Sequence, residues 1–575
     1  MSDDIKLTKE EIIKENSNYL RGTIKEELAK NTSRFEETYC NTSLLKFHGI
    51  YQQDNRDTRQ ERTQKGLEKE YSFMIRTKLP GGQLTPRQYL DLDAICNQYS
   101  NKTLRITTRQ TIQFHGVIKG NLQKTLNEIN KSLIVTYGAC GDVVRNVLAC
   151  PVCDVDPKYF INLNELARKI SDHLLPKTRA YYEIWIDGEK VENEGTNRRW
   201  GDEEKEEDEP IYGKTYLPRK FKIGLTLSDD NCVDIFSHDI GIIAIVKEDD
   251  KKIIGFNLLV GGGLGHHHNK PETYPRLASE LGFVSPDKLM DTIEQIVTIQ
   301  RDFGDRANRR HARMKYLIDD KGLDWFRTEL EKRVGTYHGK PLLEAFKKID
   351  SYKVHDHLGW HKQNNGLWYL GLFVENGRIV DTDKRKIKTG LKEIIEKFGS
   401  DIRLTPQQNI VLVNIKEEDK NKIDEIVARY NLYTEKNISS LRRNSMACPA
   451  LPTCGLALAE AERALPQIID ELEKLGFNNE ILSLRMSGCP NSCSRPPLSE
   501  LGIIGMSANK YNVYVGGSFE GTRLNKLYKE NISGEHMVSE VTKLFKAFRT
   551  NQLRNERFGD FCHRIGLKQL KVLTK

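Results

Sequence analysis

The strongest constraint on the fold of this chain is an internal repeat. The segment LRITTRQTI (104–112) resembles IRLTPQQNI (402–410), and RNVLACP (145–151) resembles RNSMACP (443–449). The two members of each pair lie 298 residues apart. Because two separate pairs of similar segments are the same number of residues apart, we predict two duplicated units, each a strand–helix–strand–helix module. A chance match would not preserve this spacing.

The duplication is expected to extend further. The C-terminal segment LGIIGMSANKYNVYVGGSFEGTR has the strand–turn pattern of DIGIIAIVKEDDKKIIGFNLLVGGG in the first half. A helix is expected near 86–99 and another in ELARKISDHLL, while YYEIWID (181–187) is expected to be a strand. The acidic stretch GDEEKEEDEP (201–210) is expected to be a solvated loop.

Four cysteines near the C-terminus form the second constraint. Cys448 and Cys454 stand six positions apart, Cys489 and Cys493 four apart, and 34 residues separate the two pairs. Two Pro- and Gly-containing loops can therefore bring four thiolates around one centre, as an iron–sulfur cluster requires. Zinc also takes four thiolates, although five residues between Cys448 and Cys454 are unusual for it. Spacing alone leaves both metals open.

The surroundings of the cysteines carry two further expectations. A helix is predicted to begin at Gly455 with its positive end toward the cysteine centre, and Pro466 is predicted to kink it. In the first copy of the repeat, Cys150 falls opposite Cys448, but Asp156 falls opposite Cys454. The first copy therefore cannot ligate a cluster in the same way, and Cys150-Pro-Val-Cys153 is interpreted as structural, with a redox or metal role as the alternative.

Polar side chains gather on two predicted strands. If 104–118 is one strand, alternation places six polar residues on one face, which either meets solvent or binds an anion. These residues are Arg105, Thr107, Arg109, Thr111, Gln113 and His115. Lys220 and Lys222 are also two apart on a predicted strand, so both ammonium groups project to one side; a surface lysine pair is the simpler explanation.

Composition excludes several classes of protein. The net charge of +8 over 575 residues is modest and not gathered in a basic tail, so nucleic-acid binding is not expected. The sequence has no apolar run of membrane-spanning length, and its first residues, MSDDIKLTKEEIIKE, lack a signal-peptide core. Eleven cysteines in so long a chain do not make a disulfide framework. A cytoplasmic protein is therefore expected.

The words around the cysteines, ACPALPTCG and RMSGCPNSCSRPP, closely resemble the siroheme and 4Fe-4S signature of the sulfite and nitrite reductases. The phrases FHGIYQQDNRDTRQER and YLPRKFKIGLTL extend the resemblance, which runs from about residue 44 to 565. It implies an α+β, internally duplicated fold with two ferredoxin-like α/β repeat modules and two related siroheme- and cluster-binding halves. The expected divisions are a charged N-terminal arm that could contact a partner (1–70), the first repeat (71–145), the first half (146–345), the second repeat (346–435) and the cluster-bearing half (436–575).

The same resemblance implies the roles of individual residues. Cys448, Cys454, Cys489 and Cys493 would hold the 4Fe-4S cluster, and Cys493 would also bridge it to the siroheme iron. The substrate-pocket cations would be Arg76, Arg145, Lys220 and Lys222. The residues matching the siroheme environment, whose eight carboxylates require a positive cavity, are Arg105, Arg109, Gln113, His115, Arg313 and Asn491.

The implied activity is the six-electron reduction of sulfite to sulfide in sulfate assimilation and cysteine biosynthesis, with nitrite reduction by the same family as the alternative. The sequence contains no flavodoxin, ferredoxin–NADP reductase or nicotinamide-binding pattern, so electrons are expected from another protein. The resemblance of the N-terminal segment favours an NADPH-dependent flavoprotein as the electron donor, and a ferredoxin is the second choice. From a different class, a zinc-stabilised binding protein could use the same four cysteines without catalysis.

Overall fold

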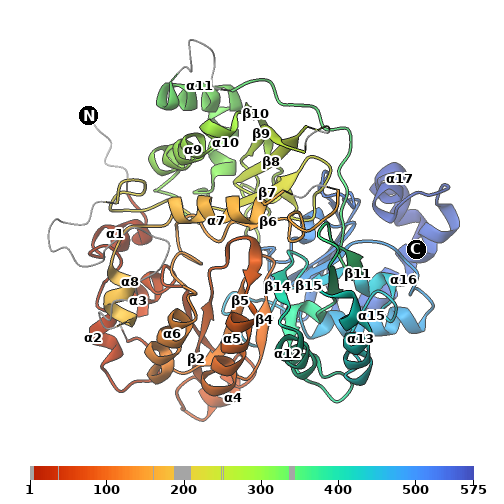
Figure 1. Cartoon of the computed structure of the whole chain (residues 1–575), viewed down its shortest axis with the longest axis horizontal. Coiled ribbons are helices and arrows are strands. Elements are labelled where there is room, and N and C mark those ends of the chain that lie inside the picture. Colours follow the sequence, from red (N-terminus) through yellow and green to blue (C-terminus); the bar gives the residue numbers. More distant parts are fainter. Residues whose placement is uncertain are drawn as a thin grey trace.

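A computed structural model describes residues 6–36, 38–158, 161–186, 209–247, 249, 251–335 and 343–575. The acidic stretch expected to be a loop (201–210) lies outside these residues except for its last two positions. The described chain contains four five-stranded sheets, arranged as two pairs of equivalent sheets (Figure 1). The predicted α+β duplicated fold is therefore confirmed.

The first pair of sheets corresponds to the two ferredoxin-like repeats. One has the strand order β1 (Ile50–Asp54), β2 (Tyr71–Arg76), β5 (Ile112–Val117), β4 (Leu104–Ile106), β13 (Arg378–Ile379). The other has the order β11 (Gly359–Lys362), β12 (Trp368–Leu372), β15 (Ile410–Ile415), β14 (Asp401–Leu404), β3 (Gln83–Leu84). The helices of the two repeats are α5 (Pro86–Tyr99) and α6 (Leu122–Lys131), and α12 (Ile387–Phe398) and α13 (Lys420–Arg429).

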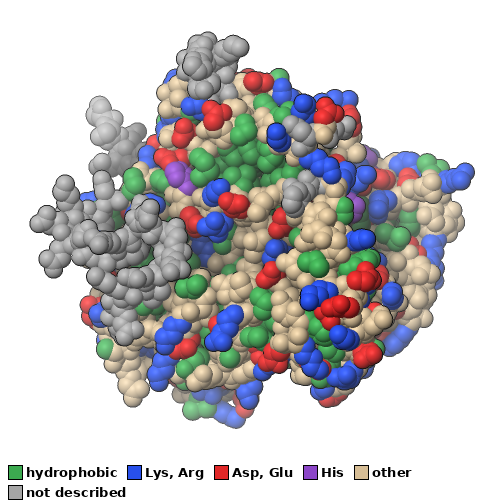
Figure 2. Space-filling view, viewed as in Figure 1, with side chains coloured by type: hydrophobic (Ala, Val, Ile, Leu, Met, Phe, Trp, Pro, Cys, Tyr) green, Lys and Arg blue, Asp and Glu red, His purple; other side chains and the backbone are tan. Residues whose placement is uncertain are grey.

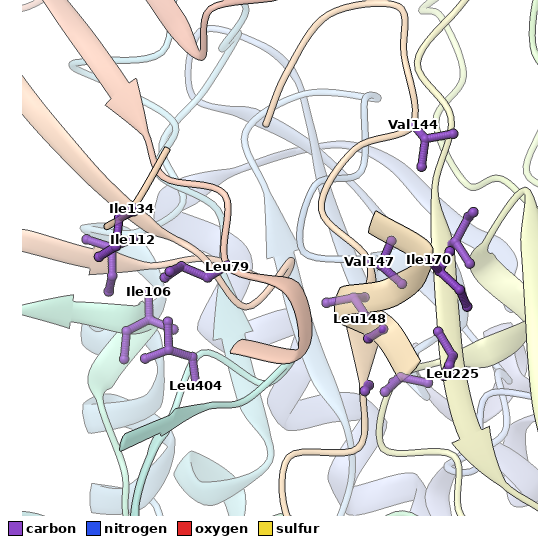
Figure 3. Packing of buried hydrophobic residues seen from close by; sticks show 14 of the residues in the cluster. Leu79, Ile106, Ile112, Ile134, Val144, Val147, Leu148, Ile170, Leu225 and Leu404 are labelled. Atoms are coloured by element: carbon purple, nitrogen blue, oxygen red, sulfur yellow. The ribbon is translucent and has the colours of Figure 1, made fainter. Parts of the chain in front are cut away.

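The two repeats exchange one short strand each. β3, from the first repeat, pairs with β14 of the second, and β13, from the second, pairs with β4 of the first. Ile106 and Leu404 consequently lie side by side in the shared core (Figure 3). A glycine with positive φ stands at each crossing: a Cβ on Gly82 would come within 2.8 Å of the Leu404 carbonyl, and one on Gly377 within 2.2 Å of the Ile106 carbonyl. The exchange thus ties the repeats together through close backbone contact.

The second pair of sheets is also equivalent in topology. β6, β7 and β8 run parallel, and β9 and β10 continue antiparallel; β16 to β20 repeat this pattern. The strands of the first half are β6 (Leu148–Ala149), β7 (Ile223–Leu227), β8 (Ile240–Val246), β9 (Ile253–Val260) and β10 (Ser279–Val284). Those of the second half are β16 (Ser445–Ala447), β17 (Leu484–Ser487), β18 (Leu501–Ser507), β19 (Lys510–Val515) and β20 (Lys526–Ser533).

Helices cover these two sheets and fill two hydrophobic cores. The first core joins both repeats to the first half, and the second, from Leu441 to Leu570, belongs to the second half. The helices of the first half are α7 (Leu163–His173), α9 (Leu289–Phe303), α10 (Met314–Lys321) and α11 (Leu323–Val334), while α8 (Ala180–Trp185) packs against α6 of the first repeat. Those of the second half are α14 (Ser440–Arg443), α15 (Ala464–Lys474), α16 (Met537–Asn551) and α17 (Phe558–Leu573).

The N-terminal segment packs on this body. Ile13 of α1 (Lys9–Glu15) is buried, and the Thr8 amide donates to the Arg306 carbonyl at 3.1 Å. Arg306 also forms an ion pair with the buried Glu11. The remaining helices of this segment are α2 (Ile24–Leu28), α3 (Thr38–Leu44) and α4 (Arg59–Gln64).

On the face shown in Figure 2, Lys and Arg side chains alternate with Asp and Glu and do not form one continuous basic block. Among the described residues, no helix combines the length and apolar character that a bilayer crossing demands.

The prediction of a single strand over 104–118 is wrong. Residues 104–117 form a hairpin of β4 and β5, because the chain reverses at Gln110, whose φ is 53°. The buried Gln110 amide fixes this turn by donating to the carbonyls of Ala149 and Leu404, both at 2.9 Å. Arg105 and Gln113 still share a face, but as cross-strand partners, and Arg109 lies in the turn.

Two other local predictions are wrong. The helix expected from Gly455 begins only at Ala464, because the intervening chain wraps back on the second cysteine loop: the Leu458 and Ala459 amides both donate to the Gly488 carbonyl. Pro466 therefore lies in the first turn, where proline is tolerated without a kink. The expected strand YYEIWID is helix α8, whose Tyr181 and Trp185, four residues apart, are fully buried; tertiary packing overrides the aromatic preference for strands.

Candidate functional site

Two neighbouring parallel strands place the cysteine loops. Cys448 follows β16 directly, and Cys489 follows β17 after Gly488. Because β16 and β17 are adjacent and parallel, both loops leave the sheet at the same edge. The Gly488 amide donates to the Cys448 sulfur at 3.3 Å, and the Asn491 side chain donates to the Cys489 sulfur at 3.5 Å. Amide donors to sulfur are typical of cluster-binding thiolates.

The two remaining cysteines lie further out on the same loops. The Cys454 amide donates to the Ala450 carbonyl at 2.9 Å, which closes the first loop into a tight turn. In the second loop, Ser487 and Ser494 hydrogen-bond through their hydroxyls at 2.7 Å, which fixes the chain after Cys493. Cys448 and Cys489 are buried, Cys454 is intermediate and Cys493 is exposed. One sulfur of the four is therefore open to the space outside the loops.

The spacing of the sulfur atoms favours one of the two metals that the sequence left open. Four thiolates on one zinc ion, at about 2.3 Å from the metal, lie roughly 3.8 Å from one another. No three of these four cysteines have sulfurs within 4.8 Å of one another; among the described residues, the group that meets this limit is a different one. The wider separation fits a cluster, which places several iron and sulfide ions between its ligands.

The protonation chemistry of the cysteines indicates a metal centre, of either kind. Burial, followed by the neighbouring Cys493 and Cys489 thiols, holds the pKa of Cys448 well above its usual range. Burial and Cys493 likewise raise the pKa of Cys489 to about 12. These crowded thiols can therefore ionise together only beside strong positive charge, which either zinc or the iron ions of a cluster would supply.

Two cations, Arg76 and Lys222, interact electrostatically with the exposed Cys493. Arg76, at the end of β2, donates to the Cys140 sulfur at 2.9 Å and also to the Gln113 side-chain oxygen at 2.6 Å once the amide is turned. Burial lowers the pKa of Arg76, but the Cys140, Tyr51 and Cys493 groups raise it more. Arg76 and Gln113, which are register partners on β2 and β5, therefore lie together near Cys493.

Lys222 and Arg313 share a carboxylate. The Lys222 amide donates to Asp239 at 2.9 Å, and Arg313 pairs with the same fully buried carboxylate at 2.8 Å. Burial and the charges of Arg313 and Arg109 hold the pKa of the Lys222 ammonium well below its usual range, while Asp239 and Cys493 act in the opposite direction. Lys222 thus stands immediately before β7, within electrostatic reach of both Arg313 and Cys493.

Lys220 and Arg145 belong to the same group of cations as Lys222. Lys220 lies two residues earlier, flanking Phe221, which bridges to Val144 beside Arg145. Burial, then Lys222 and Arg145, hold the pKa of Lys220 well below its usual range. Arg145 itself donates to the Gly141 carbonyl at 3.2 Å.

Arg109, at the hairpin turn, is braced by backbone. Its guanidinium donates to the Ile223 carbonyl at 3.2 Å and to the Asn146 carbonyl, and meets His238 Nδ1 at 3.1 Å. Burial, then Arg145 and Arg495, lower its pKa to about 9. Its Nε is buried without a partner.

Two more predicted residues lie on the other side of the hairpin. Arg105 pairs with Glu462 at 3.0 Å and donates to the carbonyl of Ala447, the residue before Cys448. Both ring nitrogens of His115 are buried without a partner, and burial holds its pKa well below the usual range. Unpartnered buried polar atoms at His115 and Arg109 are what a lining for an anionic cofactor provides.

Several residues of this site were not found from the sequence. Asp239 and His238 position cations, Arg495 donates to the Pro406 carbonyl at 2.7 Å, and Arg56 reaches the carbonyls of the first cysteine loop. The signal for Arg495 was within reach, since it lies two residues after Cys493 in SCSRPP. For Asp239 and His238 no motif exists, because their roles depend on the pairing of β7 with β8.

Comparison with known families identifies the class. The family model described as "Nitrite and sulphite reductase 4Fe-4S domain" matches residues 170–337 and 439–575, and the "Nitrite/Sulfite reductase ferredoxin-like half domain" matches 65–132 and 361–430. The chain therefore belongs to the nitrite and sulphite reductase family, as the sequence around its four C-terminal cysteines predicted.

Individual relatives are similar over nearly the whole length. The chain is 47% identical, over 96% of its length and 93% of the relative's, to a protein of Oceanobacillus iheyensis named "Sulfite reductase [NADPH] hemoprotein beta-component". It is 46% identical, over 98% and 96%, to a protein of the same name from Staphylococcus haemolyticus. Among solved structures, the Mycobacterium tuberculosis NirA protein matches with a TM-score of 0.79 and 23% identity, covering 98% of this chain and 97% of that one, which confirms the fold.

Proposed function

We propose that this chain is the siroheme-bearing component of an assimilatory sulfite reductase, which reduces sulfite to sulfide with six electrons. The observation that carries the proposal is that Cys493, the exposed member of the cysteine quartet, meets the polar hairpin of the first repeat, where the Thr108 hydroxyl donates to its carbonyl at 3.0 Å, and interacts electrostatically with the half-buried Arg76 and Lys222. A thiolate at that position can join a 4Fe-4S cluster to siroheme, with the cations turned toward the substrate side. When bound, the two cofactors supply the electron transfer and an open iron position for the substrate.

In this proposal the cations divide the work on an anionic substrate. Arg76 and Arg145 hold sulfite oxygens through the forked geometry of guanidinium. Lys220 and Lys222, whose pKa values lie well below the usual range, release protons readily to oxygens that leave as water. Because the same residues crowd positive charge together, an anion also relieves their mutual repulsion.

The residues of the cofactor side have a separate role. Arg109 and His115, with their unpartnered nitrogens, together with Arg105, Gln113, Arg313 and Asn491, would hold the siroheme carboxylates and frame the cluster loop. Asp239 contacts both Arg313 and the backbone of Lys222, and it therefore fixes a cofactor residue and a substrate residue relative to each other. Cys448, Cys454, Cys489 and Cys493 hold the cluster.

We further propose an NADPH-dependent flavoprotein as electron donor, because the relatives at 46–47% identity carry NADPH in their names. The N-terminal arm, residues 1–70, would offer the contact surface. The chain would work in the cytoplasm, where a reducing environment keeps the thiols available for iron; none of its eleven cysteines forms a disulfide in the structure.

The test is a purified, siroheme-supplied protein assayed with its flavoprotein donor. We expect siroheme and iron–sulfur absorption, donor-dependent sulfide production, and a kcat/KM that favours sulfite over nitrite. A higher kcat/KM for nitrite would assign the nitrite alternative. A colourless protein with zinc at the four cysteines would refute the proposal altogether.

A further inference from the structure

A second cluster of metal-ligating side chains is separate from the cysteine quartet and joins the first half to the segment before the second repeat. The ligand atoms of Cys150, Cys232 and His357 all lie within 4.8 Å of one another, and no other described residues form such a group. The three side chains are nearly inaccessible, with exposures of 4%, 0% and 8%. They come from three separate places in the fold: the end of β6, the loop after β7, and the segment before β11. Their spacing in the sequence therefore could not have predicted that they lie together.

This cluster occupies the position that the duplication assigns to the iron–sulfur site. Cys150 corresponds to Cys448 at the offset of 298. The segment LSDDNCVDIFSHDIGII of the first half aligns without a gap on GCPNSCSRPPLSELGII at an offset of 261, which places Cys232 opposite Cys493. The backbone agrees, since Asp234 and Arg495 both have positive φ, 52° and 61°, and each precedes a short 3-10 helix.

The duplicated site cannot hold the same cofactor. Asp156 stands opposite Cys454, and Ser228 stands opposite Cys489, so two of the four cluster thiols are missing. In their place the segment that leads into the second repeat brings an imidazole, His357. Two thiolates and a histidine at close range form a donor set that zinc prefers.

The immediate surroundings fit a metal ion. Nε2 of His357 is buried without a hydrogen-bond partner, which leaves a polar atom to be satisfied. Asp230 lies beside the group without being one of its three mutually close ligands, and its carboxylate accepts from the Cys232 amide at 3.0 Å and from the Thr226 hydroxyl at 3.3 Å. Such a carboxylate beside a ligand supports the ligand's position.

A fourth donor stands on the same turn as Cys150. Cys153, 1% exposed, donates through its sulfur to the Cys150 carbonyl at 3.3 Å. The Cys-Pro-Val-Cys spacing is one that zinc sites use to supply two ligands from one turn. Rotation of the Cys153 side chain away from that carbonyl is the change required for it to join the other three.

We propose that Cys150, Cys153, Cys232 and His357 bind one zinc ion in a closed, four-coordinate structural site. The ion would join the first half to the segment that leads into the second ferredoxin-like repeat. Binding displaces the thiol protons to solvent and involves no change of oxidation state. A closed set of four protein ligands leaves no position for substrate, so the site would contribute stability and not catalysis.

The test uses the complete holoenzyme, because zinc can be measured separately from the iron of the cofactors. Elemental analysis should find about one zinc per chain, and X-ray absorption at the zinc edge should give sulfur ligands at about 2.3 Å and one nitrogen at about 2.0 Å. Cys232→Ser and His357→Ala should each lower the zinc content about tenfold or more while the siroheme and cluster absorption persists. Cys562→Ser, which removes another buried cysteine, is the matched control and should retain zinc.

A second measurement covers variants that fail to fold. In the wild-type protein, a zinc chelator should make Cys150, Cys153 and Cys232 reactive to alkylation, with Cys562 unchanged, and should lower the thermal midpoint. The proposal is overturned if wild-type protein made with ample zinc contains none, if both variants keep full zinc, or if mass spectrometry finds a disulfide between Cys150 and Cys232.

Discussion

The first and second halves of this protein share one sheet topology but carry different chemistry. The second half places four cysteines in the loops after β16 and β17, while the first half has cysteine at two of the four equivalent positions, Cys150 and Cys232. The first half instead supplies Lys220, Lys222 and Arg313. The two halves thus share a scaffold but differ in function: the second half contributes the thiols, and the first half contributes cations.

Ion pairs hold the two copies in this arrangement. Asp234 of the first half, 1% exposed, meets Arg485 at 2.6 Å and Arg495 at 2.7 Å, both from the second half. These positions are themselves related by the duplication, since Asp234 corresponds to Arg495. Opposite charges at the equivalent positions Asp234 and Arg495 attract each other, whereas like charges there would repel.

The sharpest way to break the comparison is to exchange serine for cysteine at equivalent positions in the two halves. Cys493→Ser should abolish sulfite reduction and lose both the cluster and its coupling to siroheme, because a ligand is removed from the exposed position. Cys232→Ser should keep cluster absorption and turnover. Iron analysis and absorption spectra check both variants. Wild-type spectra in Cys493→Ser would remove it from the bridge.

The second prediction concerns the cations that the first half contributes. Lys222→Ala should lower kcat for sulfite by about 10²- to 10⁴-fold with the cofactor spectrum preserved, because a positioned proton donor is lost. Lys214→Ala, at an exposed lysine of the same segment, is the control and should leave turnover unchanged. Steady-state sulfide production measures the effect, and normal turnover of Lys222→Ala would place Lys222 outside the pocket.

The third prediction tests the ion pair between the halves. Asp234→Ala should lower the free energy of unfolding by about 3–5 kcal/mol, because Arg485 and Arg495 remain buried without their carboxylate. Asp57→Ala is the control: Asp57 also pairs across the molecule, with Arg463 at 2.6 Å, but both side chains are 47% exposed, and a loss below about 1 kcal/mol is expected.

The stability that Asp234 gains from Arg485 and Arg495 also depends on pH in a defined way. Burial opposes ionisation of Asp234, but Arg485 and Arg495 outweigh it and lower its pKa. A depressed pKa stabilises the fold above the unfolded-state value, near 4, and this stabilisation is lost as pH falls through the folded-state pKa. The difference in stability between wild type and Asp234→Asn should therefore shrink below about pH 4, as urea titrations at several pH values would measure. A constant difference would contradict the assignment.

The smallest effect is expected where the two ferredoxin-like repeats cross. Gly377→Ala should destabilise the protein by about 1–3 kcal/mol more than Gly366→Ala, because the added methyl meets the Ile106 carbonyl. Both glycines have positive φ, 74° and 82°, but Gly366 has open space around its Cβ position, so the difference isolates the close approach. Equal thermal midpoints of the two variants would show that the crossing tolerates side chains.

The sequence predicted the duplication and the cluster loops because both are local signals: words repeated at one offset, and cysteines spaced within single turns. It could not predict the strand exchange, since β3 and β13 are two residues long and pair outside their own repeat. The turn at Gln110 was missed because its amide bonds to carbonyls distant in sequence, such as that of Leu404. Asp239 and His357 were missed for the same reason: their partners are set by tertiary pairing.

The central claim is that the Cys493 thiolate joins the cluster directly to siroheme. Mössbauer spectroscopy of holoenzyme enriched in the active isotope of iron tests it most directly. If the thiolate is shared, the cluster irons should show magnetic splitting induced by the siroheme iron, as one coupled centre. Spectra that separate into an uncoupled cluster and an independent heme would contradict the account.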